Sequence, residues 1–194
     1  MTPRLQATTT MCRGVGPPEI PSRHDDSAFR IKKADCFAHR CMLPVAPTPL
    51  VGRERELALA LALLRRSEVR LLTLTGPGGI GKTRLALAVA AAAAEASFAA
   101  GVCFVPLAAV PDADLVAPAV ARAAGLVDAG DIPAQDRLVA ALRQSATLLV
   151  LDNFEHVAAA APLVGHLLAA CPGLKVLATS RTLLRVDGEH TLPV

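Results

Sequence analysis

The residues best suited to chemistry are eight consecutive positions, 76–83, with the sequence Gly-Pro-Gly-Gly-Ile-Gly-Lys-Thr. They fill the pattern G-x-x-x-x-G-K-[ST], in which a glycine loop follows a strand and precedes a helix. Glycines suit such a loop because its own N–H groups surround phosphate oxygens, and a Cβ would restrict both the backbone and its approach. We expect Lys82 to reach the β- and γ-phosphates and the Thr83 hydroxyl to bind Mg²⁺. A glycine turn that fits by chance is the alternative, and the flanking sequence argues against it.

A second candidate is Asp152, which ends the apolar run 147–151. Open α/β sheets bind ligands at the carboxyl ends of their parallel strands, so this aspartate is expected beside the phosphate loop. A carboxylate there can hold Mg²⁺ through the water shell of the ion. The alternative is an acid that merely ends a strand.

Alternating apolar and helix-like segments predict the elements that position these residues. Strands rich in apolar residues throughout are typical of a parallel sheet covered on both faces, so the pattern predicts an α/β fold. Strands are expected at 69–75, 102–107, 147–155, 174–179 and, at the end of the chain, 190–194. Helices are expected after Glu56 up to 66, at 82–97, from 112 or 114 to 124, at 134–145, and at 155–171 in two pieces, the second from about Ala161. In the helix 82–97, Leu85, Val89, Ala92 and Ala96 are expected to form the buried stripe.

The first 43 residues differ from the rest. They show no sustained period of 2 or 3.6, and we interpret them as a disordered or non-native extension before a core at 44–194. A true start at Met42 would make the preceding residues an artefact of gene calling. Cys36, Cys41, His24 and His39 could be proposed as a zinc site, but their spacing matches no standard finger.

Composition excludes several functions. Residues 44–194 hold thirteen basic and thirteen acidic side chains, and the chain has no Trp or Tyr, so neither charge nor stacking predicts a nucleic-acid surface. The five cysteines lack the spacing typical of a disulfide framework, which favours a reducing compartment. No purely apolar run reaches the length of a membrane span, and the N-terminus lacks the pattern of a secretion signal. The prediction is a cytoplasmic protein without a membrane partner.

Four motifs together resemble the signal-transduction ATPases with numerous domains (STAND), which are bacterial relatives of the NB-ARC ATPases. The likeness is strongest to the nucleotide domains of LuxR- and AfsR-type transcriptional regulators, and it covers about residues 44–194. The phosphate loop alone would indicate only an NTPase. The motifs are residues 50–54 (Leu-Val-Gly-Arg-Glu), 76–83, 148–156 (Leu-Leu-Val-Leu-Asp-Asn-Phe-Glu-His) and 175–181 (Lys-Val-Leu-Ala-Thr-Ser-Arg).

The resemblance implies a three-layer P-loop NTPase with a parallel sheet of order 5-1-4-3-2, which brings Lys82, Asp152 and Arg181 to one edge. Val51, Gly52 and Arg53 would lie against adenine and ribose, although spacing alone suggests that Arg53 is a solvated residue near a helix start. Arg181 would sense the γ-phosphate. The expected nucleotide-binding residues are Val51, Gly52, Arg53, Gly76, Pro77, Gly78, Gly79, Ile80, Gly81, Lys82, Thr83 and Arg84.

The chain departs from the family pattern in two ways. Many relatives carry a second acid after the metal-binding aspartate, where this chain has Asn153; Glu155 is the nearest substitute, so hydrolysis is expected to be slow or absent. The family's lid, winged helix and DNA-binding domain would follow Val194 or be fused elsewhere. We therefore expect a fragment with weakened nucleotide affinity that meets DNA only through domains outside this chain.

These inferences predict an ATP- and ADP-binding, Mg²⁺-dependent switch module with weak ATPase activity and nucleotide-dependent self-association. Its catalytic candidates are Lys82, Asp152, Glu155 and Arg181, and its metal ligands are Thr83 and Asp152. Two alternatives stay open. One is an ATPase of the AAA+ clamp-loader or origin-recognition kind, in which turnover is the function; the other is a remnant that only binds partners through its alanine-rich helices.

Overall fold

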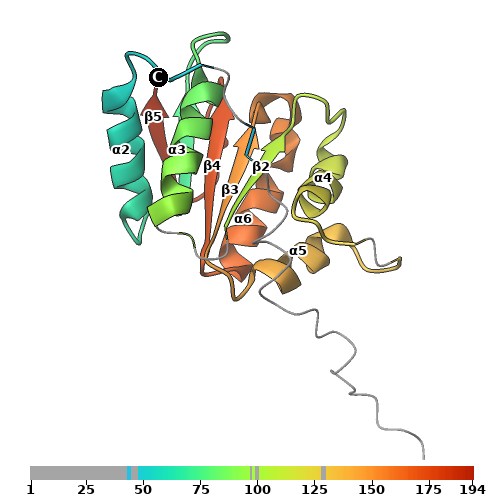
Figure 1. Cartoon of the computed structure of the whole chain (residues 1–194). Helices are drawn as coiled ribbons and strands as arrows, with labels where there is room; N and C mark the ends of the chain where they lie inside the picture. The colour runs from blue at the N-terminus through green and yellow to red at the C-terminus, as the bar shows by residue number, and fades with distance from the viewer. Residues whose placement is uncertain (1–42, 45–47, 97, 99–100, 128–129) are drawn as a thin grey trace, which may run out of the picture. The chain divides into compact units, whose positions relative to one another are not determined.

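The computed structural model describes residues 43–44, 48–96, 98, 101–127 and 130–194. The predicted extension up to residue 42, with its cysteines and histidines, lies outside the described part, as do residues 97, 99–100 and 128–129 and the side chain of Ala96. The remainder forms a parallel sheet between two layers of helices (Figure 1).

Five strands pair in the order β2-β3-β4-β1-β5, and every pairing is parallel. Counted from the opposite edge, this order is the predicted 5-1-4-3-2, so the fold prediction is confirmed. Thr75 lies opposite Ser180, and Leu151 lies opposite Ala178, so the carboxyl ends of the three central strands meet at one edge of the sheet. The strands are β1 (Leu71–Thr75), β2 (Val102–Pro106), β3 (Thr147–Asp152), β4 (Leu174–Ser180) and β5 (Glu189–Pro193).

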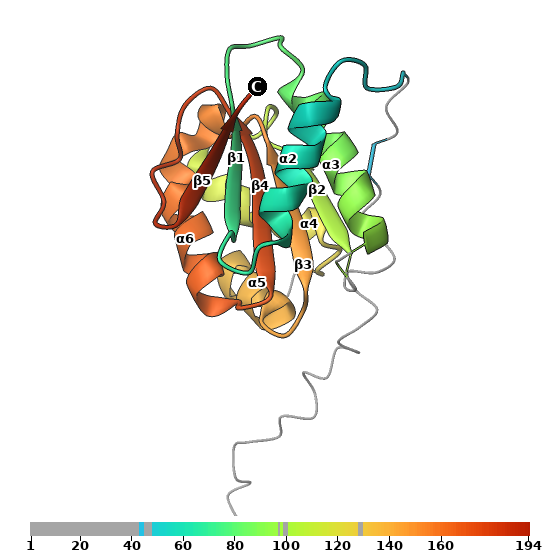
Figure 2. The same cartoon turned by 90° about the vertical axis from the view of Figure 1, so that its left-hand side faces the viewer.

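Helices cover both faces of the sheet (Figure 2). One face packs against α2 (Glu54–Arg65) and α3 (Lys82–Ala96). The other face packs against α4 (Val116–Ala123), α5 (Ala134–Leu142) and α6 (Ala161–Ala170), together with the short 3₁₀ helices η1 (Ala113–Leu115) and η2 (Phe154–Ala160). None of the helices in the described part is long and apolar enough to cross a membrane.

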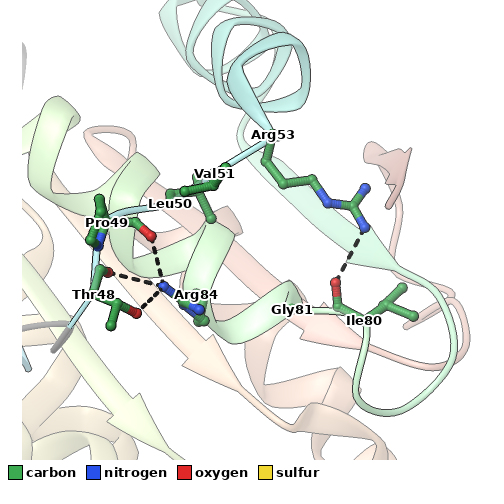
Figure 3. Close-up of a pocket in the computed structure, with 8 residues that line it drawn as sticks. All are labelled: Thr48, Pro49, Leu50, Val51, Arg53, Ile80, Gly81 and Arg84. Carbon is green, nitrogen blue, oxygen red and sulfur yellow. Dashed lines mark hydrogen bonds between the residues drawn. The ribbon is translucent and has the colours of Figure 1, made fainter.

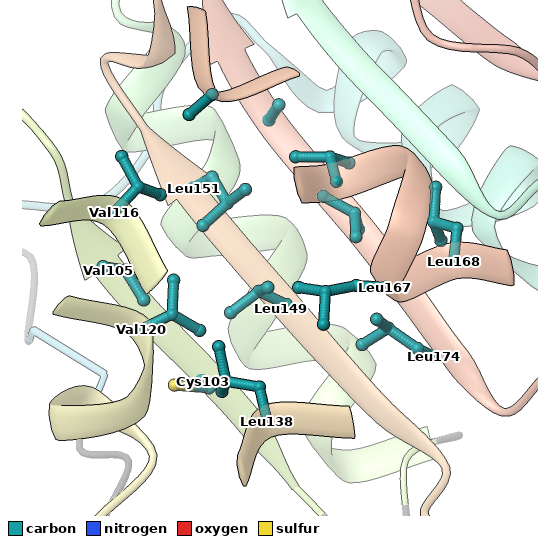
Figure 4. Close-up of a cluster of buried hydrophobic side chains, with 14 of the residues drawn as sticks. Cys103, Val105, Val116, Val120, Leu138, Leu149, Leu151, Leu167, Leu168 and Leu174 are labelled. Carbon is teal, nitrogen blue, oxygen red and sulfur yellow. The ribbon is translucent and has the colours of Figure 1, made fainter. Parts of the chain in front are cut away.

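The two faces of β3 explain its unbroken apolar run. Successive side chains of a strand point to opposite faces, so Leu149 and Leu151 enter the cluster under α4, α5 and α6 (Figure 4), whereas Leu148 and Val150 enter the cluster under α2 and α3. All six residues of β3 are buried. A strand in the middle of a three-layer fold therefore has no solvent side that polar residues could occupy.

Two local details, in β3 and α3, differ from the sequence-based expectation. The third strand ends at Asp152 rather than 155, because Asn153 adopts a left-handed conformation (φ 61°, ψ 44°) that turns the chain out of the sheet. In α3 the buried stripe is Leu85, Ala86, Val89, Ala90 and Ala93. Ala92, which was predicted in the stripe, is only half-buried because it lies at the margin of the stripe, whereas Ala93 lies within it.

The helix around Pro118 confirms the expected cap and shows why the proline is tolerated. The Asp112 side chain accepts the N–H of Asp114 and caps η1. Pro118 is the third residue of α4, where the N–H has no partner within the helix in any case. Proline therefore costs this helix little.

Replacing Leu149 with alanine is expected to lower the free energy of unfolding by about 2–5 kcal/mol, because the side chain is 2% exposed and its loss leaves a cavity. Leu59→Ala makes the same chemical change on α2, where the side chain is 53% exposed, and should change stability by less than about 0.5 kcal/mol. Urea unfolding followed by circular dichroism measures both. Equal losses would contradict the burial described here.

Candidate functional site

The phosphate loop connects β1 to α3 and depends on glycine. Gly76 has a φ of 151°, and a Cβ at this position would overlap the Ile80 side chain and lie 3.0 Å from the carbonyl oxygen of Val194. Gly79 and Gly81 have φ values of 80° and 94°, in the region that other residues rarely adopt. The loop can therefore take this path only with glycine at these positions.

Lys82 begins α3 and folds back over the loop. Its Nζ donates hydrogen bonds to the carbonyl oxygens of Gly76 and Pro77, both at 2.8 Å. The side chain is almost completely buried, so these bonds satisfy an ammonium group that has little access to water. The arrangement places one positive charge within the loop.

Thr83 and Asp152 come together from distant parts of the chain. Thr83 Oγ1 donates to Asp152 Oδ1 at 2.7 Å, and Thr179 Oγ1 donates to the same oxygen at 2.6 Å. The Thr179 hydroxyl in turn accepts the backbone N–H of Asn153 at 2.9 Å. Two hydroxyl donors stabilise the charge of this carboxylate, which is 6% exposed. Hydroxyl and carboxylate oxygens are ligands that Mg²⁺ prefers, so the two predicted metal residues are suitably placed.

The sequence reasoning missed Thr179 as a site residue. It belongs to the polar end of β4, where Thr179 and Ser180 precede Arg181. The signal was a run of polar residues that ends a buried strand. Which of them would contact the carboxylate depends on the register of β4 against β3.

Arg181 and Glu155 form an ion pair beside the loop. Arg181 Nε lies 3.1 Å from Glu155 Oε1. A Cβ on Gly78 would lie 3.5 Å from Arg181 Nη2, so the guanidinium rests against the phosphate loop. The structure thus places both side chains near the loop, with the carboxylate oxygen Oε1 directed at the arginine.

A cavity of about 340 Å³ adjoins the loop on the side of α2 (Figure 3). Arg53 reaches from its rim to the carbonyl oxygen of Ile80 at 3.3 Å and to Glu56 Oε1 at 2.6 Å. The hydrogen bond from Arg53 holds the pKa of Glu56 below its ordinary value. The cavity is lined by Thr48, Pro49, Leu50, Val51, Arg53, Ile80, Gly81 and Arg84.

Arg84, in the first turn of α3, binds the segment that precedes α2 and holds it near the phosphate loop. Its Nη2 donates to the carbonyl oxygens of Thr48 and Pro49, each at 2.9 Å, and to Thr48 Oγ1 at 2.6 Å. Val51 is exposed at the cavity, and the Gly52 N–H donates to Glu54 Oε1 at 3.1 Å. The residues predicted on the adenine side therefore border a cavity next to the phosphate loop, although Gly52 itself does not line it.

A parallel sheet of this order with a glycine loop after β1 defines a P-loop NTPase fold. Residues 49–177 match the AAA ATPase domain family, and the chain belongs to that family. Nucleotide binding is the property that this family implies.

The chain is also similar to longer mycobacterial proteins. Over 92 residues, or 47% of its length, it is 46% identical to a Mycobacterium tuberculosis protein named "Putative HTH-type transcriptional regulator", and the aligned stretch covers 10% of that relative. An uncharacterised Mycobacterium bovis protein is 41% identical over 86 residues, which cover 44% of this chain and 22% of the relative. The chain thus matches only a small part of these relatives.

Two solved structures share the fold. Cdc6p from Pyrobaculum aerophilum has a TM-score of 0.57 and 16% identity, covering 78% of this chain and 44% of its own. The ORC2 protein of Aeropyrum pernix, solved as ADPNP-ADP complexes, has a TM-score of 0.52 and 18% identity, covering 81% of this chain and 52% of its own. At this level of identity the likeness concerns the fold alone.

Thr179→Val is expected to lower the free energy of unfolding by about 1–3 kcal/mol, because Asp152 loses a hydroxyl donor and the Asn153 N–H loses its acceptor. Thr73→Val is the matched control on β1. The Thr73 hydroxyl is buried without a hydrogen-bond partner among the described residues, so this change should leave stability equal or raise it by up to about 1 kcal/mol. Chemical denaturation separates the two, and a larger loss at position 73 would contradict the described network.

Proposed function

We propose that residues 44–194 form an ATP- and ADP-binding module that acts as a Mg²⁺-dependent nucleotide switch in a STAND-type transcriptional regulator. The observation that carries this proposal is the hydrogen bond between Thr83 and the buried Asp152 beside the glycine loop. An acid at the end of β3 and a hydroxyl at the start of α3 meet beside this loop, whose backbone N–H groups we expect to bind phosphate.

The residues present fit both phosphate and metal. The space where a Cβ would stand is open at Gly79 and Gly81, one ammonium lies within the loop, and two oxygen ligands, from Thr83 and Asp152, stand next to it. In our proposal Lys82 and the amides of 78–83 bind phosphate, while Thr83 and Asp152 hold the ion. When bound, Mg²⁺ neutralises phosphate charge. The cavity bordered by Val51 and Arg53 would take adenine and ribose.

The regulatory part of the proposal is supported by the relatives. The mycobacterial protein that is 46% identical over 92 residues is named as an HTH-type transcriptional regulator, and the shared stretch is a small part of it. Residues 44–194 are balanced in charge, so contact with DNA would come from domains outside this chain. Bound nucleotide would bias the arrangement of such domains.

Slow hydrolysis is part of the same proposal. Asn153, the residue after Asp152, has a neutral amide, and Glu155 Oε1 is engaged by Arg181. The Asn153 amide is not a base, and the other oxygen of Glu155, Oε2, is buried, so neither side chain, as arranged here, is an accessible base for an attacking water. A second candidate is an ATPase with real turnover, which membership of the AAA ATPase domain family supports. A steady rate of about 1 s⁻¹ or more would support turnover over switching.

Lys82→Ala should abolish binding of ATP and ADP, because the loop loses its ammonium group. Isothermal titration calorimetry of the full chain with each nucleotide and Mg²⁺ measures this. Arg143→Ala removes one positive charge from the exposed end of α5 and is expected to bind like the wild type. Unchanged affinity in Lys82→Ala would refute the assignment, and a wild-type chain that binds no nucleotide would favour the partner-binding remnant.

Asp152→Asn is expected to leave weak nucleotide binding but to remove its dependence on Mg²⁺. The amide keeps an oxygen that can accept from Thr83 and Thr179, so the change removes mainly the charge. Titrations with and without Mg²⁺ give the ratio of affinities, and Asp136→Asn on the exposed face of α5 controls for the lost charge. If the metal dependence survives in Asp152→Asn, another acid holds the ion.

A further inference from the structure

The pair formed by Arg181 and Glu155 is asymmetric. The arginine side chain is 59% exposed, whereas the glutamate side chain is 14% exposed. Glu155 Oε2 is buried and has no hydrogen-bond partner among the described residues. Arg181 is therefore the main stabilising partner of a carboxylate that has little water around it.

The backbone holds the glutamate in place. Asn153 turns the chain out of β3 in a left-handed conformation, and Phe154 is fully buried in the core. Glu155 follows directly in the first turn of η2 and cannot follow the arginine outward without disturbing that core. Arg181, at the end of β4, has a long side chain that can change rotamer at little cost. The arginine is thus the partner that moves if the pair separates.

The guanidinium also rests against Gly78 of the phosphate loop. We propose that Glu155 is an internal anion that competes with the terminal phosphate of a bound nucleotide for Arg181, and thereby sets the ratio of ATP to ADP affinity. This inference rests on the proposed function. ADP lacks the terminal phosphate and leaves the pair intact, whereas ATP must draw the arginine away from a buried carboxylate. A ligand shifts such an equilibrium only by its differential interaction with the two arrangements.

The test compares ADP with a non-hydrolysable ATP analogue, adenylyl imidodiphosphate, by calorimetry on the full chain with Mg²⁺. Glu155→Gln should raise affinity for the analogue about fivefold, the scale of a partly exposed ion pair, and change ADP affinity by less than about twofold. Glu95→Gln removes the same charge from an exposed position near the far end of α3, and its affinities should match the wild type.

A double-mutant cycle shows whether Glu155 acts through the arginine. In an Arg181→Ala background, Glu155→Gln should no longer change the ratio of the two affinities. Glu155→Asp keeps the charge but withdraws it from Arg181, and should give a smaller rise in the same direction. Glu155→Asp replaces Glu155→Gln in the test if the glutamine variant does not fold.

Three results would overturn the inference. They are an unchanged ratio in Glu155→Gln, a lower affinity for the analogue, and an equal rise with Arg181 absent. Each of these results leaves the proposed function intact as long as the wild type binds nucleotide and Lys82→Ala does not. A wild-type chain that binds neither nucleotide would instead overturn both.

Discussion

The buried carboxylate of Asp152 is the interaction on which the site depends. It joins three elements, because its Oδ1 accepts hydroxyl groups from Thr83 at the start of α3 and Thr179 near the end of β4. A charge this poorly solvated is tolerated only with such donors. The same contacts hold the start of α3, and with it the end of the phosphate loop that precedes this helix. The pairing of β3 with β4 therefore also positions the site.

The cations around the loop already have partners in this structure. Lys82 donates to loop carbonyls, Arg84 to the segment that precedes α2, Arg53 to Ile80 and Glu56, and Arg181 to Glu155. An anionic ligand must exchange at least some of these contacts for its own. Binding of an anion is thereby coupled to rearrangement of these side chains.

The position of Arg53 illustrates how local pattern and tertiary contact differ. By spacing it is a solvated residue before a helix, and the ion pair with Glu56 one turn later agrees with that view. The contact with the carbonyl of Ile80, 27 residues away, could not be derived from spacing. Only the resemblance to a nucleotide-binding family placed Arg53 near the loop, and the structure puts it at the rim of the adjoining cavity.

The amino-acid sequence by itself determined the class of fold and the phosphate loop. These two follow from local patterns, since apolar runs, glycines at required backbone angles and an acid at a strand end are visible without coordinates. The strand order was implied only by the resemblance of the four motifs to a known family. Only the tertiary structure decided that Thr179 binds Asp152 and that Glu155 faces Arg181. Such contacts join residues 26 or 27 positions apart, and they depend on strand register and on the left-handed turn at Asn153, which no periodicity encodes.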